Sequence, residues 1–301
     1  MWYSPNGPVS YYYPIENYHY DDDSTHCPFF IRHAVASEDG NILLGFGGGP
    51  DVRDPSHLPK MSVDGGKSWT KITNTDIPGA GWTRAVGISP DGTIQCILTR
   101  YFTLYIRKNN MRWKKIKIPA EPKDFHTDGI LEVTNSGTLI TTGNYGKLYI
   151  SKDLGKTWKT EGLGSHKLAI TKDGKSIIAL LYLGYGNADD QSILMRSDDL
   201  GDSWTTIATF KERIQRFLIS EDAQVLVAQN SDRTIISSRD SGLTWKTLLE
   251  LDKDDFISAF FLSTEDNLTI KVLAYTDYIE YLSVDGGLTF TKESILKKIQ
   301  G

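Results

Sequence analysis

The stretch Ser62-Val63-Asp64-Gly65-Gly66-Lys67-Ser68-Trp69 decides the fold, because close copies of it recur along the chain. The shared pattern is Ser, Asp, Gly and Ser or Thr at alternate positions, closed by Trp or Phe. Four more copies occupy residues 151–158, 197–204, 238–245 and 283–290. Self-similarity at a fixed period predicts a chain built from successive copies of one supersecondary unit.

A sixth, degenerate copy ends at Trp113. The other closing aromatic residues are Trp69, Trp158, Trp204, Trp245 and Phe290, and the first of their spacings is about twice the others. Residues 108–113 read Lys-Asn-Asn-Met-Arg-Trp, which lacks the Asp and places Asn110 where the other copies have Gly. Asn is the next-best residue after Gly for a positive φ. With Trp113 included, the spacings are 44, 45, 46, 41 and 45 residues, which predicts six units.

Each unit also carries a hairpin signal ahead of the repeated stretch. Two short apolar runs flank a polar turn, often Asp-Gly, at residues 34–43, 85–94, 130–139 and 168–177. Such a pattern is typical of two antiparallel strands, and the repeated stretch then turns a third strand into a fourth. Four strands in about 40–45 residues predict an all-β, six-bladed β-propeller of four-stranded antiparallel blades.

The residue types of the repeated stretch explain its spacing. An Asp carboxylate accepts N–H groups of its own turn, Gly supplies positive φ, and the closing aromatic ring packs against neighbouring strands. We therefore expect a structural role for the five aspartates Asp64, Asp153, Asp199, Asp240 and Asp285. A role in ligand or metal binding is the weaker alternative.

These stretches resemble the Asp-box (BNR) repeats of a β-propeller superfamily. That superfamily includes sialidases, sortilin-type receptors, certain glycoside hydrolases and non-enzymatic assembly factors. The resemblance covers about residues 29–297 and implies propeller blades with Asp-box turns. It does not imply one chemistry, because one fold hosts many functions.

The first 28 residues lie outside the repeat count. They hold six tyrosines, and Pro5, Pro8 and Pro14 argue against a helix. We expect residues 1–28 to form a Tyr-rich N-terminal arm and residues 29–301 to form the propeller. The arm either packs on a blade or helps to close the ring, or it offers a contact surface for a partner or glycan.

Composition excludes several classes of function. The net charge is −5 with acids and bases interspersed, so no basic stripe points to nucleic acid. No apolar run is long enough for membrane insertion, and no signal peptide is recognisable. Cys27 and Cys96 suit neither a disulfide scaffold nor a metal site. We expect no cofactor and no metal, in a soluble chain that is cytoplasmic or part of an assembled particle.

Arginine, histidine and tyrosine residues gather where a propeller usually binds its ligands, at the starts of the inner strands and in the loops between second and third strands. Candidate ligand-binding residues are Arg32, His33, Arg53, Arg84, Arg100, Tyr185, Arg213 and Arg233. Further members of this face are His126, Asp128, His166, Tyr182 and Arg216. Guanidinium groups suit carboxylate or phosphate ligands. The alternative is that these arginines only pair with nearby acids.

The first unit also resembles the first blade of sialidases in the order of its residues. By that resemblance Arg32 and Arg53 would hold a carboxylate, and Asp51 or Asp54 would be the catalytic acid. Tyr275 would be the nucleophile, activated by Glu280 or Glu132. The family's Arg-Ile-Pro motif is absent, and the places of its Glu and of a further Arg hold Asp128 and Asn144.

The sequence therefore favours a non-catalytic recognition or assembly propeller. We expect it to bind a protein partner or glycan on its Arg/His/Tyr-rich face, and a larger assembly such as a virion is one setting for that role. The alternative is a sialidase-like glycoside hydrolase that removes an acidic sugar from a chain end. The second function needs a nucleophile, a base and an acid at one place.

Overall fold

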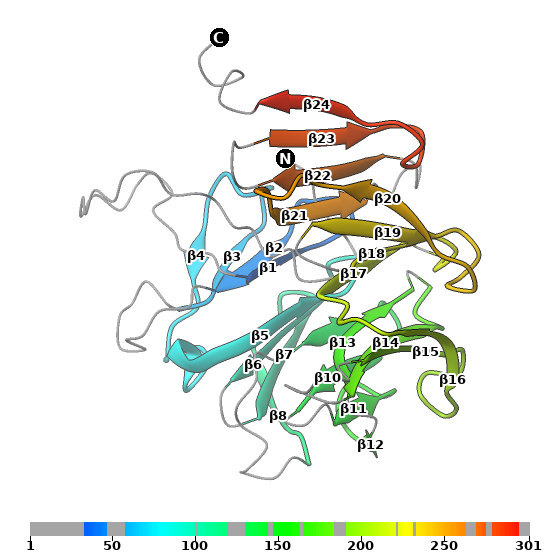
Figure 1. Ribbon diagram of the computed structural model, residues 1–301. Helices are drawn as coiled ribbons and strands as arrows, with labels where there is room; N and C mark the ends of the chain where they lie inside the picture. The colour runs from blue at the N-terminus through cyan, green and yellow to red at the C-terminus, as the bar shows by residue number, and fades with distance from the viewer. Residues whose placement is uncertain are drawn as a thin grey trace.

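The chain folds into six four-stranded antiparallel sheets, which follow one another in chain order around the molecule (Figure 1). The computed structural model describes residues 33–46, 58–99, 102–119, 130–143, 147–162, 165–171, 173–183, 191–220, 222–230, 233–262, 269–274 and 279–294. The expected N-terminal arm, residues 1–28, lies outside this part of the chain. Within the described part, the sheets have the four strands per unit that the repeat predicts, and each sheet is called a blade below.

The blades are meanders in which consecutive strands pair. Blade 1 comprises β1 (His33–Ala36), β2 (Leu43–Phe46), β3 (Lys60–Ser62) and β4 (Thr70–Lys71). Blade 2 follows a short 3-10 helix, η2 (Ala80–Trp82), and comprises β5 (Thr83–Ile88), β6 (Ile94–Thr99), β7 (Thr103–Lys108) and β8 (Lys114–Lys117). Blade 3 comprises β9 (Leu131–Val133), β10 (Leu139–Thr142), β11 (Leu148–Ser151) and β12 (Lys159–Glu161).

The second half repeats the plan with longer strands. Blade 4 comprises β13 (Ser165–Ile170), β14 (Ile177–Leu183), β15 (Gln191–Ser197) and β16 (Thr205–Phe210). Blade 5 comprises β17 (Arg216–Ile219), β18 (Leu226–Gln229), β19 (Thr234–Ser238) and β20 (Lys246–Glu250). Blade 6 comprises β21 (Ile257–Leu262), β22 (Ile270–Ala274), β23 (Ile279–Ser283) and β24 (Thr291–Ser294).

The first strand of each blade is the inner one. First strands of successive blades contact each other: β1 contacts β5, β5 contacts β9, β13 contacts β17, and β17 contacts β21. Because each blade is a meander, all six inner strands begin on one side of the molecule. We call that side the mouth. The first hairpin turns and the repeated turns lie on the opposite side, which we call the box side.

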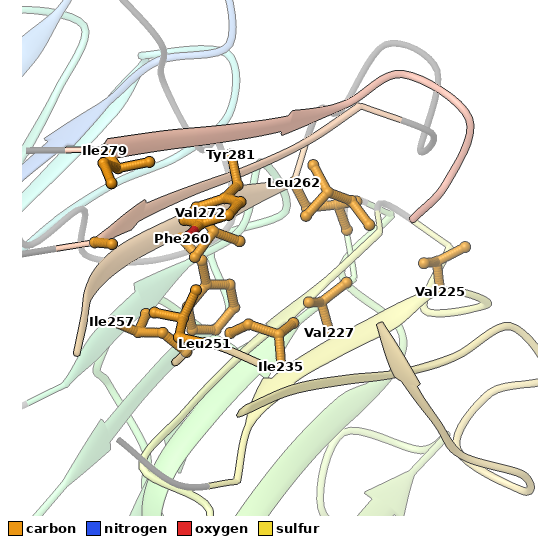
Figure 2. Close-up of a cluster of buried hydrophobic side chains, with 12 residues drawn as sticks. Val225, Val227, Ile235, Leu251, Ile257, Phe260, Leu262, Val272, Ile279 and Tyr281 are labelled. Atoms are coloured by element: carbon orange, nitrogen blue, oxygen red, sulfur yellow. The ribbon is translucent and has the colours of Figure 1, made fainter. Parts of the chain in front are cut away.

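Apolar side chains between the blades form the core. Five buried clusters occupy the five successive junctions from blades 1 and 2 to blades 5 and 6. Figure 2 shows the last of these, where Val227 and Ile235 of blade 5 face Phe260, Val272 and Tyr281 of blade 6. Among the described residues, no comparable cluster joins blade 6 to blade 1. The blades thus depend on their neighbours for burial, as the stacking of repeats requires.

The repeated turns are closed by a common set of hydrogen bonds. In the first, the Ser62 hydroxyl donates to Asp64 (2.7 Å) and accepts the Gly66 N–H (2.8 Å). The Ser68 N–H and hydroxyl both donate to Asp64, at 2.9 and 2.6 Å. The same bonds recur at Asp153, Asp199, Asp240 and Asp285.

These bonds stabilise the ionised carboxylates. The Ser68 hydroxyl is the largest cause that lowers the pKa of Asp64, to about 2. Thr157 and Thr244 act in the same way on Asp153 and Asp240, whose pKa values also fall to about 2. The pKa values of Asp199 and Asp285 are lowered by the same type of contact.

Two consecutive residues of positive φ make each of these turns. The pair is Asn109 (φ 49°) and Asn110 (φ 58°) in the degenerate copy, and Gly65 (φ 70°) and Gly66 (φ 85°) in the first. Leu154 and Leu200 occupy the first of the two positions in blades 3 and 4, with φ of 59°. Asn110 therefore takes the backbone conformation that the spacing of Trp113 predicts.

The closing aromatic rings are half-buried, less than the sequence suggested. The indole N–H of Trp69, Trp158 and Trp245 donates to the carbonyl of the turn's own glycine at 2.9–3.1 Å. The indole N–H of Trp204 is buried without a partner. Arg107 lies 5.1 Å from the ring centroid of Trp113, and Phe290 packs against the junction of blades 5 and 6.

A second set of hydrogen bonds closes the first hairpins. A hydroxyl donates to an Asp two residues later in Ser37–Asp39, Ser89–Asp91, Thr171–Asp173 and Ser220–Asp222, at 2.6–2.7 Å. The Asp-Gly pairs predicted the turns at Asp39, Asp91 and Asp173. The turn at Asp222, where Ala223 stands in place of Gly, was not predicted, and neither was the role of the hydroxyl two positions before each Asp. Local bonds therefore occupy many of the polar side chains on the box side.

Candidate functional site

The mouth holds every described member of the predicted ligand-binding set. His33 is the first residue of β1, Arg84 the second of β5, Arg213 precedes β17, and Arg233 precedes β19. Arg84 makes no ion pair or hydrogen bond within the described contacts. Nine candidates lie outside the described residues: Arg32, Asp51, Arg53, Asp54, Arg100, His126, Asp128, Tyr185 and Tyr275.

The inner strands of blades 2, 4 and 6 share an irregularity at the mouth. Their pairing register shifts between Thr83 and Ala85, between Ser165 and Lys167, and between Ile257 and Ala259. In blades 2 and 4 the extra residues are Arg84 and His166. A register shift of this kind changes the direction of nearby side chains and is frequent beside binding sites.

Three cations of blades 4 and 5 form a basic cluster, which we define as Lys167, Arg213 and Arg216. Lys167 lies opposite Leu180 in β13–β14, and Arg216 lies opposite Gln229 in β17–β18, while β13 contacts β17. Burial lowers the pKa of Lys167, and the charges of Arg216 and Arg213 lower it further. Lys167 and Arg216 are half-buried and Arg213 is exposed, so the cluster extends from solvent into the junction.

Tyr182 holds one member of the cluster in place. The Arg213 guanidinium lies 4.6 Å from the Tyr182 ring centroid, a cation–π arrangement. The Tyr182 hydroxyl donates to the Ile214 carbonyl at 2.5 Å, and the Ile214 N–H donates to the Ser192 hydroxyl at 2.8 Å. Burial raises the pKa of Tyr182, and Arg213 opposes that rise. The segment that carries Arg213 is thus tied to blade 4.

Gln229 adds a buried acceptor beside the cluster. It is the last residue of β18, at the mouth, and only 1% of its surface is exposed. Its Oε1 has no hydrogen-bond partner. A buried acceptor without a donor is costly, so this atom is suited to a donor brought by a ligand or water.

The two carboxylates considered as a glycosidase base lie in different blades. Glu280 in β23 pairs with Lys271 in β22 at 2.9 Å, on the face of blade 6 turned away from blade 5. Glu132 in β9 lies opposite Ile140, on the face that packs against blade 4. Burial raises the pKa of Glu132 to about 8, and its Oε1 has no partner.

Within the described ranges, no three His, Cys, Asp or Glu side chains are grouped closely enough to hold a metal ion. Cys96 is buried with a free thiol whose pKa is raised by burial, and Cys27 lies outside these ranges. None of the described helices is long and apolar enough to span a membrane.

Sequence reasoning found Arg213, Arg216 and Tyr182 but missed Lys167. The signal for Lys167 was its place directly after His166, at the start of an inner strand. In a regularly paired strand, the position of the first residue predicts which side chains lie at the mouth. The register shift in β13 changes that pattern, so the position of Lys167 could not be predicted in this way. The burial of Glu132 had no local signal.

Comparison with known proteins identifies the fold class. A structure of YCF48 bound to a D1 peptide is similar, with a TM-score of 0.65, 16% identity, and coverage of 99% of this chain and 89% of that one. YCF48 from Cyanidioschyzon merolae is similar with a TM-score of 0.60 and 14% identity, and the match covers 86% of this chain and 83% of that one. The Cps50 (Swd1) β-propeller domain of Myceliophteria thermophila is similar with a TM-score of 0.57 and 9% identity, and the match covers 88% of this chain and 87% of that one.

The chain is therefore a β-propeller, and its six sheets are the blades. No protein-family model matches the chain, and no curated protein matches it in sequence. Identities of 9–16% establish the shared fold and leave the function to the site itself.

Proposed function

We propose that this chain is a non-catalytic recognition or assembly propeller that binds a protein partner at its mouth. The observation that carries the proposal is the basic cluster, in which two successive blades bring three cations together. A glycosidase would need either Glu280 or Glu132 as its base. One of them is ion-paired with Lys271, and the other is buried among apolar side chains.

Two further observations support this function. On the box side, the turn carboxylates accept local hydrogen bonds, so these charged groups serve the turns themselves. One protein of similar fold, YCF48, is known in a peptide-bound form. A β-propeller can therefore present a peptide-binding surface, although the residues that do so here must be this chain's own.

The turns also support a more detailed assignment. We interpret them as Asp-boxes, because the Ser, Asp, Gly and Ser/Thr groups bond as that repeat requires and Asn109-Asn110 keeps the conformation in the degenerate copy. On this interpretation residues 29–301 form one propeller domain, with residues 1–28 as a separate arm.

A selection experiment tests the proposed function. A displayed library of random twelve-residue peptides would be selected against the full chain and then against a mouth variant, Arg84→Gln/Arg213→Gln/Arg216→Gln. Enriched peptides that bind the wild-type chain and not the variant are expected. Failure to enrich any peptide, or turnover of a fluorogenic sialoside by the wild-type chain, would contradict the proposal.

A further inference from the structure

The basic cluster has the geometry of a site for carboxylate groups. A guanidinium offers two parallel N–H donors that match the two oxygens of a carboxylate. Arg213 is exposed and stacked on Tyr182, so its donors are already oriented before a ligand arrives. Arg216 and Lys167 lie deeper, and ion pairs formed there are less screened by salt.

The surroundings of the cluster limit the size of the anion. The cluster spans one junction, between blades 4 and 5. The connection from blade 5 to blade 6, also at the mouth, carries the exposed carboxylates of Asp252 and Asp254 on either side of Lys253, while Asp255 is buried. A long polyanion that crossed both junctions would meet these carboxylates and be repelled. A short acidic segment with neutral or basic neighbours meets no such repulsion.

The uncharged groups at the site favour a peptide as the carrier of the carboxylates. Gln229 presents a buried acceptor next to Arg216, and a peptide main chain supplies N–H donors at regular intervals. Carboxylates on Asp or Glu side chains extend from the main chain on flexible stems and reach half-buried cations. We infer that the basic cluster Lys167, Arg213 and Arg216 binds the carboxylates of a short acidic peptide segment of the protein partner.

The inference rests on the proposed function and adds a proton linkage to it. Because burial and the two arginines lower the pKa of Lys167, part of its charge is lost at a lower pH than for an ordinary lysine. A bound carboxylate favours the charged ammonium and raises that pKa again. Binding at alkaline pH should therefore take up protons, and affinity should fall as pH rises.

Fluorescence anisotropy with matched peptides tests the inference. The probe is a fluorescein-labelled twelve-residue peptide of Gly, Ser and four Glu residues, and its control has Gln at the four Glu positions. The wild-type chain should bind the Glu peptide and not the Gln peptide. Arg213→Gln and Arg216→Gln should each weaken binding about tenfold or more, since hydrogen bonds to charged groups contribute about 1.5–3 kcal/mol.

Two variants separate binding from folding. Arg112→Gln makes the same change at an exposed residue of the box side and should leave binding unchanged. Arg213→Lys keeps the charge but removes the planar fork, and it should bind more weakly than wild type and more tightly than Arg213→Gln. Each variant would be compared with wild type in a thermal melt, so that a loss of fold is recognised.

Three results would overturn the inference. The first is that the Gln peptide binds as tightly as the Glu peptide. The second is that Arg112→Gln weakens binding as much as Arg213→Gln or Arg216→Gln. The third is that oligogalacturonate, an acidic oligosaccharide, binds more tightly than the Glu peptide. If neutral peptides from the selection bind at the mouth while the Glu peptide does not, the proposed function stands and the inference fails. If no peptide of either kind binds, both fail.

Discussion

Glu132 provides a strong test of how the blades pack. Its side chain points from β9 into the junction of blades 3 and 4, where the buried neighbours include Ile140, Leu168 and Ile170. One carboxyl oxygen is buried without a hydrogen-bond partner. A charged carboxylate is strongly disfavoured in such a place, so the folded chain keeps the proton that the unfolded chain releases.

The magnitude follows from the two pKa values. The pKa of Glu132 is about 8 in the folded chain, against 4.5 for an ordinary Glu. Stability from this group is complete below pH 4.5 and decreases as the pH rises towards 8. At 1.36 kcal/mol per pKa unit, the free energy of unfolding at pH 7 is lower by about 3 kcal/mol than in acid, on account of Glu132 alone.

Glu132→Gln removes the carboxyl group that titrates and keeps a side chain of the same size and shape. We expect the variant to unfold at higher urea concentration than wild type at pH 7–8. The difference between the two should shrink as the pH falls to 5. Urea unfolding followed by tryptophan fluorescence at pH 5, 6, 7 and 8 measures it.

Glu250→Gln is the matched control, because Glu250 is exposed on the outer strand β20. The difference in urea midpoint between Glu250→Gln and wild type should not grow as the pH rises from 5 to 8. If the difference between Glu132→Gln and wild type is constant from pH 5 to 8, the Glu132 carboxylate is solvated and the described packing of blades 3 and 4 is wrong.

Three other changes test the turns and the core. Asp153→Asn should lower the thermal unfolding temperature at pH 7, and the gap from wild type should close as the pH falls towards about 2, where the folded-state carboxylate is protonated; a gap that persists there would contradict the role of the charge. Asn110→Gly should match or exceed wild type in stability while Asn110→Ala loses about 1 kcal/mol, because φ at this position is 58°; equal urea midpoints for the two variants would contradict the turn. In a Cys27→Ser chain the buried Cys96 thiol should stay unreactive towards Ellman's reagent until urea unfolds the protein, and reaction in buffer would refute its burial.

The repeat was predictable because its chemistry is local. A hydroxyl, a carboxylate and two residues of positive φ close a turn within eight residues, so their order is visible in the chain. Even the degenerate copy could be found, since Asn110 satisfies the same backbone requirement and Trp113 keeps the spacing. The half-burial of the rings was not predictable, because it depends on the neighbouring blade.

The site was predictable only in part, because it joins blades. Inner-strand starts placed Arg84 and Arg213 at the mouth, and the loop between second and third strands placed Arg233 there. No sequence pattern says that Lys167 and Arg216 approach each other across a junction. Glu280 looked like a possible base, whereas the diagonal neighbour Lys271 pairs with it. Such pairings depend on register between strands.

Photo-crosslinking tests the central claim, that the mouth over blades 4 and 5 is the recognition surface. The Glu peptide would carry a benzoylphenylalanine at its centre, and mass spectrometry would locate the cross-links on the full chain. Cross-links should fall within residues 165–183 and 213–230 and disappear in Arg216→Gln. Cross-links confined to the repeated turns at 238–245 and 283–290, or unaffected by that substitution, would contradict the account.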